Sequence, residues 1–430
     1  MKIVYITAGA GGMYCGSCMR DNTLVAGLCN LGHDALLVPT YTPIRTDEEN
    51  VSQSRMFFGG INVYLQQKAG LFRHTPAFFD RLLDGWLLRK ASGGSVSIDA
   101  QQLGDLTLSM LEGSHGKQRK EVAKLADAIA NEFRPDVVVL TNVLLSGLVP
   151  ELTKRWHGPV LATLQGDDIF LEQLPADARK GALERIQVNC QHVDGFVATS
   201  RYYADFMAGY FGLPHERIHV VYPGINPSGF QESTATRSAD TPLTIGYFAR
   251  IAPEKGLHLL AEAFVRLRQM TDAPKCRLRF AGYLGKHNEP YLADVMKTLK
   301  ALPRDDVEHL DCPDRASKIR FFQGIDVLSV PSPYRDPKGL YVFESLACGV
   351  PVVQPRHGSF PEWIEATGGG LLFEPNDPAS LAGTLKRLLL DADLRCRLGT
   401  QGRQAVHDRF TAQHMATKTI EILQQYTERK

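Results

Sequence analysis

Short apolar runs alternate along the chain with longer segments in which apolar residues recur every three or four positions. The apolar run at 3–6 leads through a glycine-rich turn to a segment with Leu24, Leu28 and Leu31 on one face. This pattern predicts a strand followed by an amphipathic helix that stops at Gly32. Further strands of the first half are predicted at 35–38, 136–140, 159–164, 195–199 and 217–221.

The second half of the chain restarts the same rhythm. Alternating strands and helices are typical of an α/β fold in which helices cover both faces of a parallel sheet. The segment 226–242 is rich in Pro, Ser, Thr and Gly, as linkers are. We therefore predict two doubly wound domains, 1–228 and 240–408, a boundary near residue 235, and a C-terminal helix at 409–430. The strands of the second half are predicted at 243–248, 277–281, 325–330, 350–354 and 370–373.

Residues 41–116 depart from this rhythm, and we interpret them as an insertion in the first domain. Ile61, Val63 and Leu65 alternate with other residues, and the segment 78–87 carries aromatic and aliphatic residues at helical spacing. That spacing favours additional core. An acceptor-binding or partner-binding element stays the alternative.

Charge and hydropathy exclude several classes of protein. The 430 residues include 48 basic and 47 acidic ones, so nothing favours non-specific attraction to nucleic acid. No apolar run reaches the length of a membrane span, and the run after Lys2 is too short for a signal peptide. We therefore expect a cytoplasmic protein, with peripheral contact at the inner face of the membrane left open. Eight cysteines are too few for a disulfide framework in a chain of this length.

Doubly wound domains bind ligands beyond the C-terminal ends of their strands, so residues directly after strands are the first candidates. The turn 9–12 (Gly-Ala-Gly-Gly) allows a ligand close to the backbone and leads into a helix N-terminus. It is a weak signal, because many such turns use glycine for packing alone. It also lacks the third glycine of the dinucleotide fingerprint, since Tyr14 stands there, which argues against a dehydrogenase.

Two segments of the second half carry charged residues directly after predicted strands. Arg250 and Lys255 flank a proline turn that opens a helix. Cations at such a place suit a diphosphate leaving group, although two solvated cations would give the same pattern. The longer string 331–353 places Asp336 in a loop and Glu344 in a helix that begins near Gly339. Carboxylates can accept hydrogen bonds from sugar hydroxyls, and the free N–H groups around 339–341 can meet a phosphate.

Two segments of the first half are less specific. Asp167 and Asp168 follow a strand and could bind acceptor hydroxyls, but acidic residues that begin a helix are an equally good explanation. Cys15 and Cys18 stand at a helix start, where a thiolate is favoured. A metal site would need two more ligands, so we favour packing or acceptor contact over redox or metal chemistry.

The string 331–353 resembles the signature of retaining GT-B glycosyltransferases, especially glycosyltransferase family 4. That signature is Glu, seven residues, Glu, and then an Ala–Gly–Pro-Val-Val run, and here Asp336 takes the first Glu position. Arg250 and Lys255 match the phosphate clamp of the family, and 226–230 and 358–362 resemble its linker and its next loop. Outside 41–116 the resemblance covers nearly the whole chain. The insertion itself is similar to the longer first domains of glycogen and starch synthases.

The resemblance implies two Rossmann-like domains that face each other across a cleft, with the C-terminal helix returning to the first domain. It implies that Glu344 binds the ribose hydroxyls of the donor nucleotide and that Asp336 contacts the donor sugar. Arg250 and Lys255 would hold the diphosphate, and Asp311 would lie near the nucleobase. The other implied donor contacts are Gly12, Gln165, Gly339, Leu340 and Tyr341.

Two positions depart from the family pattern. Asp336 replaces Glu, and Gln165 stands where related enzymes usually have His. Gln can donate and accept hydrogen bonds but cannot hold a positive charge. Both positions belong to the implied donor-sugar pocket, so these departures would either change the choice of donor or weaken the enzyme.

The resulting hypothesis is a retaining hexosyltransferase that moves a sugar from a nucleoside-diphosphate donor to a carbohydrate or lipid-linked acceptor. It would need neither a metal ion nor another cofactor, because cations and helix dipoles stabilise the leaving group. The alternatives are a degenerate GT-B protein that binds sugar nucleotides without turnover, a glucosyltransferase like glycogen or starch synthase, and a GT-B epimerase. A phosphorylase lacks a lysine context for pyridoxal phosphate.

Overall fold

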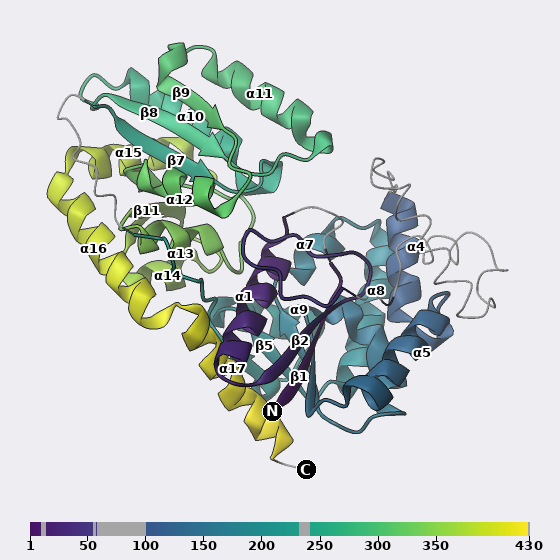
Figure 1. The fold of residues 1–430 in the computed structure, drawn as a ribbon. Coiled ribbons are helices and arrows are strands. Elements are labelled where there is room, and N and C mark those ends of the chain that lie inside the picture. Colours follow the sequence, from purple (N-terminus) through teal and green to yellow (C-terminus); the bar gives the residue numbers. More distant parts are fainter. Residues whose placement is uncertain (10–13, 55–56, 58–99, 232–240, 429–430) are drawn as a thin grey trace. The chain divides into compact units, whose positions relative to one another are not determined.

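The computed structural model describes residues 1–9, 14–54, 57, 100–231 and 241–428, and Figure 1 shows their fold. The backbone contacts divide the chain into two compact units. Unit 1 comprises residues 1–221 and 416–430, and unit 2 comprises residues 222–415. Gly12, most of the predicted insertion including 61–65 and 78–87, and the predicted boundary near 235 lie outside the described residues.

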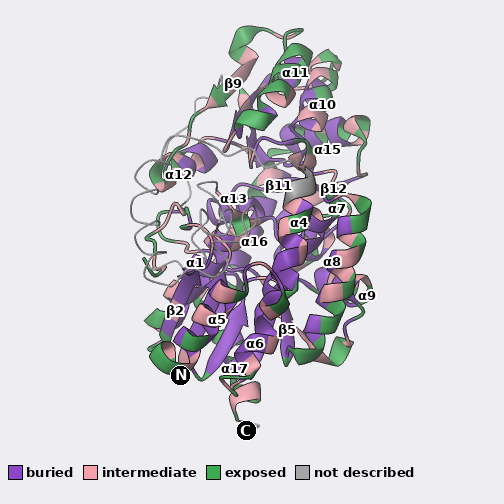
Figure 2. Cartoon of the chain, turned by 90° about the vertical axis from the view of Figure 1, so that its right-hand side faces the viewer, coloured by how far each residue is buried: buried purple, intermediate pink, exposed green. Residues whose placement is uncertain are grey.

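Unit 1 is built on a six-stranded sheet in which all neighbouring strands are parallel. Along β1, Val4 and Ile6 join one packed cluster, whereas Ile3 and Tyr5 point to the opposite face. All four are almost fully buried, so both faces of the sheet are covered (Figure 2). In the order β2-β1-β3-β4-β5-β6, the strands are Asp34–Pro39, Lys2–Thr7, Val137–Leu140, Val160–Leu164, Gly195–Ala198 and Ile218–Val220.

Helices and short helical turns cover this sheet. The hydroxyl of Ser200 accepts a hydrogen bond from the Tyr203 N–H at 3.0 Å and so caps the start of α9. The helices are α1 (Gly16–Asn30), α4 (Ala100–Leu111), α5 (Arg119–Ala128), α6 (Val149–Thr153), α7 (Asp167–Glu172), α8 (Ala176–Asn189) and α9 (Arg201–Phe211). The helical turns are Gly113–His115, Ile129–Phe133, Val143–Leu148, Cys190–His192 and His215–Arg217.

The last helix, α17 (Ala412–Thr427), begins in unit 2 and ends in unit 1. Near its end, the Tyr426 hydroxyl lies 2.8 Å from His219 Nε2 on β6. The same tyrosine packs against Gly195 at the start of β5, where a side chain would collide with it. The C-terminal turns of α17 are therefore fixed on the sheet of unit 1.

Unit 2 has a second six-stranded parallel sheet with the order β12-β11-β10-β7-β8-β9. In that order the strands are Gly370–Phe373, Val352–Pro355, Val327–Leu328, Leu243–Phe248, Cys276–Ala281 and Val307–Leu310. The helices are α10 (Leu257–Gln269), α11 (Glu289–Leu299), α12 (Arg315–Gln323), α13 (Leu340–Ala347), α14 (Phe360–Thr367), α15 (Pro378–Leu390) and α16 (Ala392–Arg409). Short helical turns occupy Pro253–Lys255, Lys286–Asn288 and Arg304–Asp306.

The predicted strands agree with these bounds within a few residues, with two exceptions. Strand β9 was not predicted, because Glu308 and His309 interrupt the apolar pattern on this edge strand. Strand β10 covers only Val327–Leu328 of the predicted 325–330. On the neighbouring chain segment, Pro351 directly before β11 has no N–H to donate to β10. On the other side of β10, the Ser329 N–H still donates to the Gly246 carbonyl at 2.9 Å.

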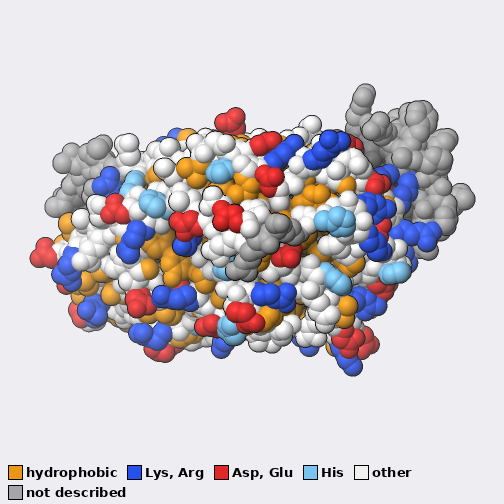
Figure 3. Space-filling view, turned by 90° about the horizontal axis from the view of Figure 1, so that it is seen from below, with side chains coloured by type: hydrophobic (Ala, Val, Ile, Leu, Met, Phe, Trp, Pro, Cys, Tyr) orange, Lys and Arg blue, Asp and Glu red, His pale blue; other side chains and the backbone are white. Residues whose placement is uncertain are grey.

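The surface carries both signs of charge. On the face shown in Figure 3, basic and acidic side chains are interspersed, as the net charge of +1 leads one to expect. Within the described residues, no helix combines the length and the apolar composition of a membrane span.

An aromatic cluster forms the core beneath α13 and α14 in unit 2. The ring of Trp363 lies 5.2 Å from that of Phe343 and 5.3 Å from that of Tyr222, and Phe343 stacks on Phe410 at 4.9 Å. Trp363 is fully buried. Burial of this much aromatic surface fixes the two helices against each other and against the segments that carry Tyr222 and Phe410.

Replacing Trp363 with Ala should therefore lower the free energy of unfolding by about 3–5 kcal/mol, because a large cavity would replace a buried ring. Urea denaturation followed by circular dichroism would measure this. Leu390→Ala, at a position that is 56% exposed, is the control and should change stability by less than about 0.5 kcal/mol. Equal effects of the two substitutions would contradict the assignment of this cluster as the core.

Candidate functional site

The order of strands in unit 2 reverses between β7 and β10. Chain connections run from β7 toward β8 and β9 on one side, and from β10 toward β11 and β12 on the other. Loops that follow the two central strands diverge at such a point and leave room for a ligand. The loop after β7 carries Arg250 and Lys255, and the loop after β10 carries Asp336. The two strongest predicted segments therefore meet at the expected place in the sheet.

The two loops approach each other closely. Gly256, at φ +75°, ends the turn that holds Lys255, and a Cβ there would lie 2.0 Å from the carbonyl oxygen of Pro331. The Ser332 hydroxyl donates to the Glu254 carbonyl at 2.7 Å. Glycine is thus required by both the backbone conformation and the contact between the loops.

Lys255 and Asp336 form an ion pair across this contact. The side chain of Asp336 is 5% exposed and that of Lys255 is 16% exposed. The other oxygen of Asp336, Oδ1, accepts from the N–H groups of Lys338 and Gly339 at 3.0 and 3.1 Å. Oδ2 also accepts from the Tyr341 hydroxyl at 3.2 Å. Both oxygens of this carboxylate are therefore engaged by groups of unit 2.

The protonation of Asp336 reflects these partners. Burial alone would raise its pKa, but the charge and hydrogen bond of Lys255, with the Lys338 N–H, outweigh burial and lower the pKa to about 2. Burial raises the pKa of Tyr341, whose hydroxyl stays a donor. The ammonium of Lys255 also lies 5.9 Å from the centroid of the Tyr341 ring.

The loop that carries Asp336 is held from a third side by the segment before α14. The Ser359 N–H donates to the Asp336 carbonyl at 3.0 Å, and its hydroxyl donates to the Pro337 carbonyl at 3.0 Å. His357 Nε2 lies 2.9 Å from the Ser332 carbonyl oxygen. The loop between β10 and α13 is thereby fixed before any ligand binds.

Arg250 lies at the rim of this arrangement. Its side chain is 37% exposed, and its guanidinium donates to Glu254 Oε1 at 2.6 Å. The Tyr247 hydroxyl donates to the Arg250 carbonyl at 3.1 Å and holds the backbone. Arg250 thus keeps a solvent-accessible cation beside the turn that ends at Lys255.

Helix α13 begins at this loop. Gly339 is its N-cap in the left-handed conformation, at φ +58°, and no side chain caps the helix there. The first N–H groups of a helix have no partner within the helix, and they carry the positive end of its dipole. The predicted donor contacts Gly339, Leu340 and Tyr341 form this terminus. Asp336 links it to Lys255, because the carboxylate accepts from the Gly339 N–H and pairs with the lysine.

Glu344 lies one turn further along α13 and forms a second buried ion pair. Its Oε1 accepts from Lys318 Nζ on α12 at 2.5 Å, and the side chain of Glu344 is 10% exposed. Lys318 is not among the site residues predicted from the sequence, because a lysine in an amphipathic helix usually faces solvent. Its spacing of three and four residues from Phe321 and Phe322 puts it on the apolar face, which was the available signal.

Asp311 follows β9 at the same edge of the sheet and is exposed. No contact joins it to Lys255, Asp336 or Glu344 among the described residues. The structure therefore brings together Lys255, Asp336 and the start of α13, with Arg250 on the same loop as Lys255, and leaves Asp311 apart from them.

Gln165 belongs to a polar network inside unit 1. Its amide nitrogen donates to the Thr141 carbonyl at 2.8 Å and lies 3.2 Å from both carboxylate oxygens of Asp21. Asp21 also pairs with Arg20 at 2.9 Å and accepts from the Thr141 hydroxyl. All four side chains are buried, and the network lies where β3 and β4 end.

Asp167 and Asp168 also find their partners within unit 1. Asp167 accepts from the N–H groups of Val143 at 2.9 Å and Gln165 at 3.0 Å. Burial raises the pKa of Asp167 to about 6, although these hydrogen bonds oppose the shift. Asp168 accepts from the Tyr203 hydroxyl at 2.5 Å. Both acids are buried at the start of α7 and tie the loop after β4 to neighbouring elements.

Cys15 and Cys18 stand at the start of α1, and neither forms a disulfide. Cys18 is buried, and its sulfur lies 3.8 Å from the Thr7 hydroxyl. Among the described residues, no group of three or more His, Cys, Asp and Glu side chains has the arrangement of a metal site.

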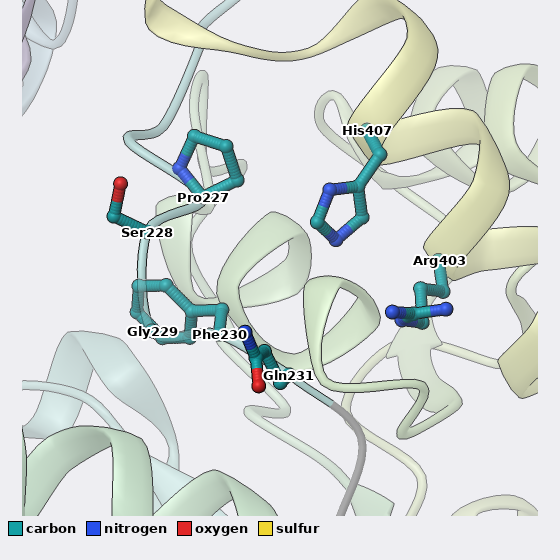
Figure 4. A pocket seen from close by; sticks show the side chains of 7 residues that line it. All are labelled: Pro227, Ser228, Gly229, Phe230, Gln231, Arg403 and His407. Atoms are coloured by element: carbon teal, nitrogen blue, oxygen red, sulfur yellow. The ribbon is translucent and has the colours of Figure 1, made fainter.

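Unit 2 also has an open hollow of about 440 Å³ beside α16 (Figure 4). Arg403 and His407 extend from α16 toward the chain segment 227–231, which forms the other wall. None of the predicted site residues lines it. We therefore place the candidate site at the loops after β7 and β10, where the ion pairs and the helix terminus converge, and not in this hollow.

Comparisons with known proteins agree with the fold. The family profile described as Glycosyltransferase Family 4 matches residues 110–228, and the profile described as Glycosyl transferases group 1 matches residues 230–405. A D-inositol 3-phosphate glycosyltransferase from Stackebrandtia nassauensis is 30% identical over 297 residues. That alignment covers 65% of this chain and spans 66% of the length of the relative.

Solved structures show the same architecture at low sequence identity. Sucrose-phosphate synthase from Thermosynechococcus elongatus is 16% identical, and both chains are covered completely with a TM-score of 0.73. HepE from Anabaena in complex with UDP is also 16% identical, with a TM-score of 0.68 over 99% of this chain and 100% of that chain. The chain therefore belongs to glycosyltransferase family 4, and its two parallel sheets are the Rossmann-like domains of the GT-B fold.

Proposed function

We propose that the protein is a retaining hexosyltransferase that takes its sugar from a nucleoside-diphosphate donor and passes it to a carbohydrate or lipid-linked acceptor. The observation that supports this most is that Asp336 holds Lys255 beside the start of α13 at the switch point of unit 2, with Arg250 on the same loop as Lys255. Two cations and free N–H groups stabilise the negative charge that develops on a departing diphosphate.

In this proposal Asp336 positions other groups. Its carboxylate accepts hydrogen bonds from Lys255, Lys338, Gly339 and Tyr341, so it holds the lysine beside the helix terminus. Asp336 has a shorter side chain than the Glu of the family pattern. This length suits the role, because its carboxylate accepts from the N–H groups of Lys338 and Gly339 in its own loop. A hydroxyl of the donor sugar would then meet a carboxylate of Asp336 that is already paired with Lys255.

Retention follows in this proposal from attack on the same face of the sugar, with the leaving diphosphate accepting the proton of the acceptor. This route needs no carboxylate nucleophile, unlike that of a retaining glycosidase. The ion pairs of Asp336 and Glu344 support this route, because a carboxylate that is paired with a lysine is a poor nucleophile. Arg250 and Lys255 supply positive charge to the leaving group, so the proposal includes neither a metal ion nor another cofactor.

The second candidate function is binding of a sugar nucleotide without turnover. The buried position of Gln165 in the network of Asp21 and Thr141 favours it, because this side chain already has partners within unit 1. Turnover of the donor separates the two functions, whereas binding alone does not.

The first test is a thermal-shift screen of purified protein with UDP, GDP and ADP and with their glucose and mannose conjugates. A ligand that binds only the folded state raises the melting temperature. We expect a shift with the nucleotides of one base, lost in Glu344→Ala and kept in Glu262→Ala, whose side chain is exposed on α10.

The nucleotide found in this way is then followed as a sugar donor with candidate acceptors, including inositol phosphates because of the name of the relative described above. Release of nucleoside diphosphate together with a product of unchanged anomeric configuration, seen by NMR, supports the proposal. An inverted product would reject the retaining route. Binding without any release would establish the second candidate.

Replacing Arg250 with Gln should lower kcat/KM for the donor by roughly a hundredfold to a thousandfold, because one charge facing the leaving group is lost. Arg250 is a partly exposed residue whose pair with Glu254 adds little to stability, so the melting temperature should stay near that of the wild type. Steady-state kinetics would measure this. Arg266→Gln, on the exposed side of α10, is the matched control, and equal rates for both variants would remove Arg250 from the site.

Asp336→Asn should lower the free energy of unfolding at pH 7 by about 2 kcal/mol, since the variant leaves Lys255 without its buried partner. The pKa of Asp336 lies below its unfolded value, so its stabilisation is present above about pH 4 and is lost as the pH falls toward 2. The difference between wild type and variant should therefore shrink over that range. Urea unfolding at several pH values would show a constant difference if the ion pair contributed nothing.

A further inference from the structure

Lys318 is a buried lysine, and its surroundings call for an explanation. It lies on α12, its side chain is only 5% exposed, and it shares the apolar face of the helix with Phe321 and Phe322. Burying an ammonium group is unfavourable unless a partner balances its charge. The partner here is Glu344 on α13, whose Oε1 accepts from Lys318 Nζ at 2.5 Å.

The position of Lys318 is fixed from several sides. An N-terminal capping box of Asp314 and Ser317 sets the start of α12. One turn before Lys318, Arg315 donates to the carbonyls of Asn226 and Ser228 at 2.7 and 3.0 Å. The Lys318 ammonium lies 5.7 Å from the centroid of the Phe230 ring, which is fully buried. The lysine therefore reaches Glu344 from a rigid support.

The pair leaves a defined part of the carboxylate open. Oε1 of Glu344 receives the hydrogen bond of Lys318, whereas Oε2 receives none from the residues that the structure describes. A carboxylate that is to accept a hydrogen bond from a hydroxyl group works best when its rotamer is already fixed. Helix α12 lies in the chain between β9 and β10, and α13 follows β10, so the pair joins the helices on either side of a central strand in the sequence.

We infer that Lys318 is a positioning residue of the donor site, which holds Glu344 so that its second oxygen accepts a hydrogen bond from the ribose of the nucleotide. This inference rests on the function proposed above, in which Glu344 binds ribose. Lys318 acts through Glu344 and does not contact the nucleotide. The alternative is an ion pair that stabilises unit 2 without any influence on ligand binding.

Substitution of Lys318 by Met separates these two roles, because Met keeps an unbranched apolar stem and removes the charge. Isothermal titration calorimetry would give the dissociation constants of UDP, GDP and ADP, and of the 2′-deoxy form of the one that binds. We expect Lys318→Met to weaken the ribonucleotide by on the order of tenfold to a hundredfold, the range of one hydrogen bond to a charged group. The deoxynucleotide should change far less. Lys297→Met, at an exposed position on α11, is the control and should change neither.

Lys318→Met alone leaves Glu344 buried without a partner, and this variant could fail to fold. The double variant Lys318→Met with Glu344→Gln removes both charges and provides a second test. We expect Lys318→Met added to Glu344→Gln to change ribonucleotide affinity less than about twofold beyond Glu344→Gln itself, because the lysine acts through the carboxylate. A loss of affinity for ribose and deoxyribose forms alike in this background would mean that Lys318 contacts the nucleotide, and would overturn the inference.

The failure of this inference and that of the proposed function give different results. If Lys318→Met folds and binds the ribonucleotide as the wild type does, while Glu344→Ala loses binding, the positioning role is wrong and the donor site stands. If Glu344→Ala also binds like the wild type, or if the wild type binds none of the three nucleotides, the proposed donor site is wrong and the inference falls with it.

Discussion

The ion pair between Lys255 and Asp336 is the interaction on which the candidate site depends. It joins the loops after β7 and β10, the two strands between which the sheet of unit 2 reverses its order. A buried carboxylate without this lysine would be costly, and the lysine without the carboxylate equally so. The hydrogen bonds that Asp336 accepts from Lys338, Gly339 and Tyr341 then set the start of α13. A cation and a helix terminus are thus fixed relative to each other before a ligand arrives.

A second buried pair repeats this arrangement one turn along the same helix. Lys318 and Glu344 join α12 to α13, as Lys255 and Asp336 join α10 and its turn to the start of α13. Both pairs use a lysine that is distant in sequence from its carboxylate. Beneath them, the aromatic cluster around Trp363 and Phe343 holds α13 and α14. Apolar packing therefore holds the helices of this region together, and the ion pairs fix the orientation of its polar groups and add to its stability.

Unit 1 handles its polar residues differently. Asp21, Thr141 and Gln165 form a network that is buried at the carboxyl ends of its strands, and Asp167 and Asp168 bind backbone and side-chain donors of the same unit. These contacts explain why polar residues can follow apolar strands without being exposed to solvent. A polar residue that directly follows a strand can therefore serve the structure of its own loop. The contacts of Asp167 and Asp168 are of this kind.

The sequence by itself determined the class of fold, nearly all the strands, and the loops that carry the candidate site. These depend on local periodicity and on the glycines and prolines at the ends of elements, which neighbouring residues encode. Only the tertiary structure decided how the charged residues are used. Lys255 and Asp336 are 81 residues apart, and Lys318 and Glu344 are 26 apart, so no local pattern pairs them. Strand β9, with its charged residues, likewise becomes a strand through pairing with β8. Contacts of this kind arise from packing between elements, and a pattern along one chain segment does not contain them.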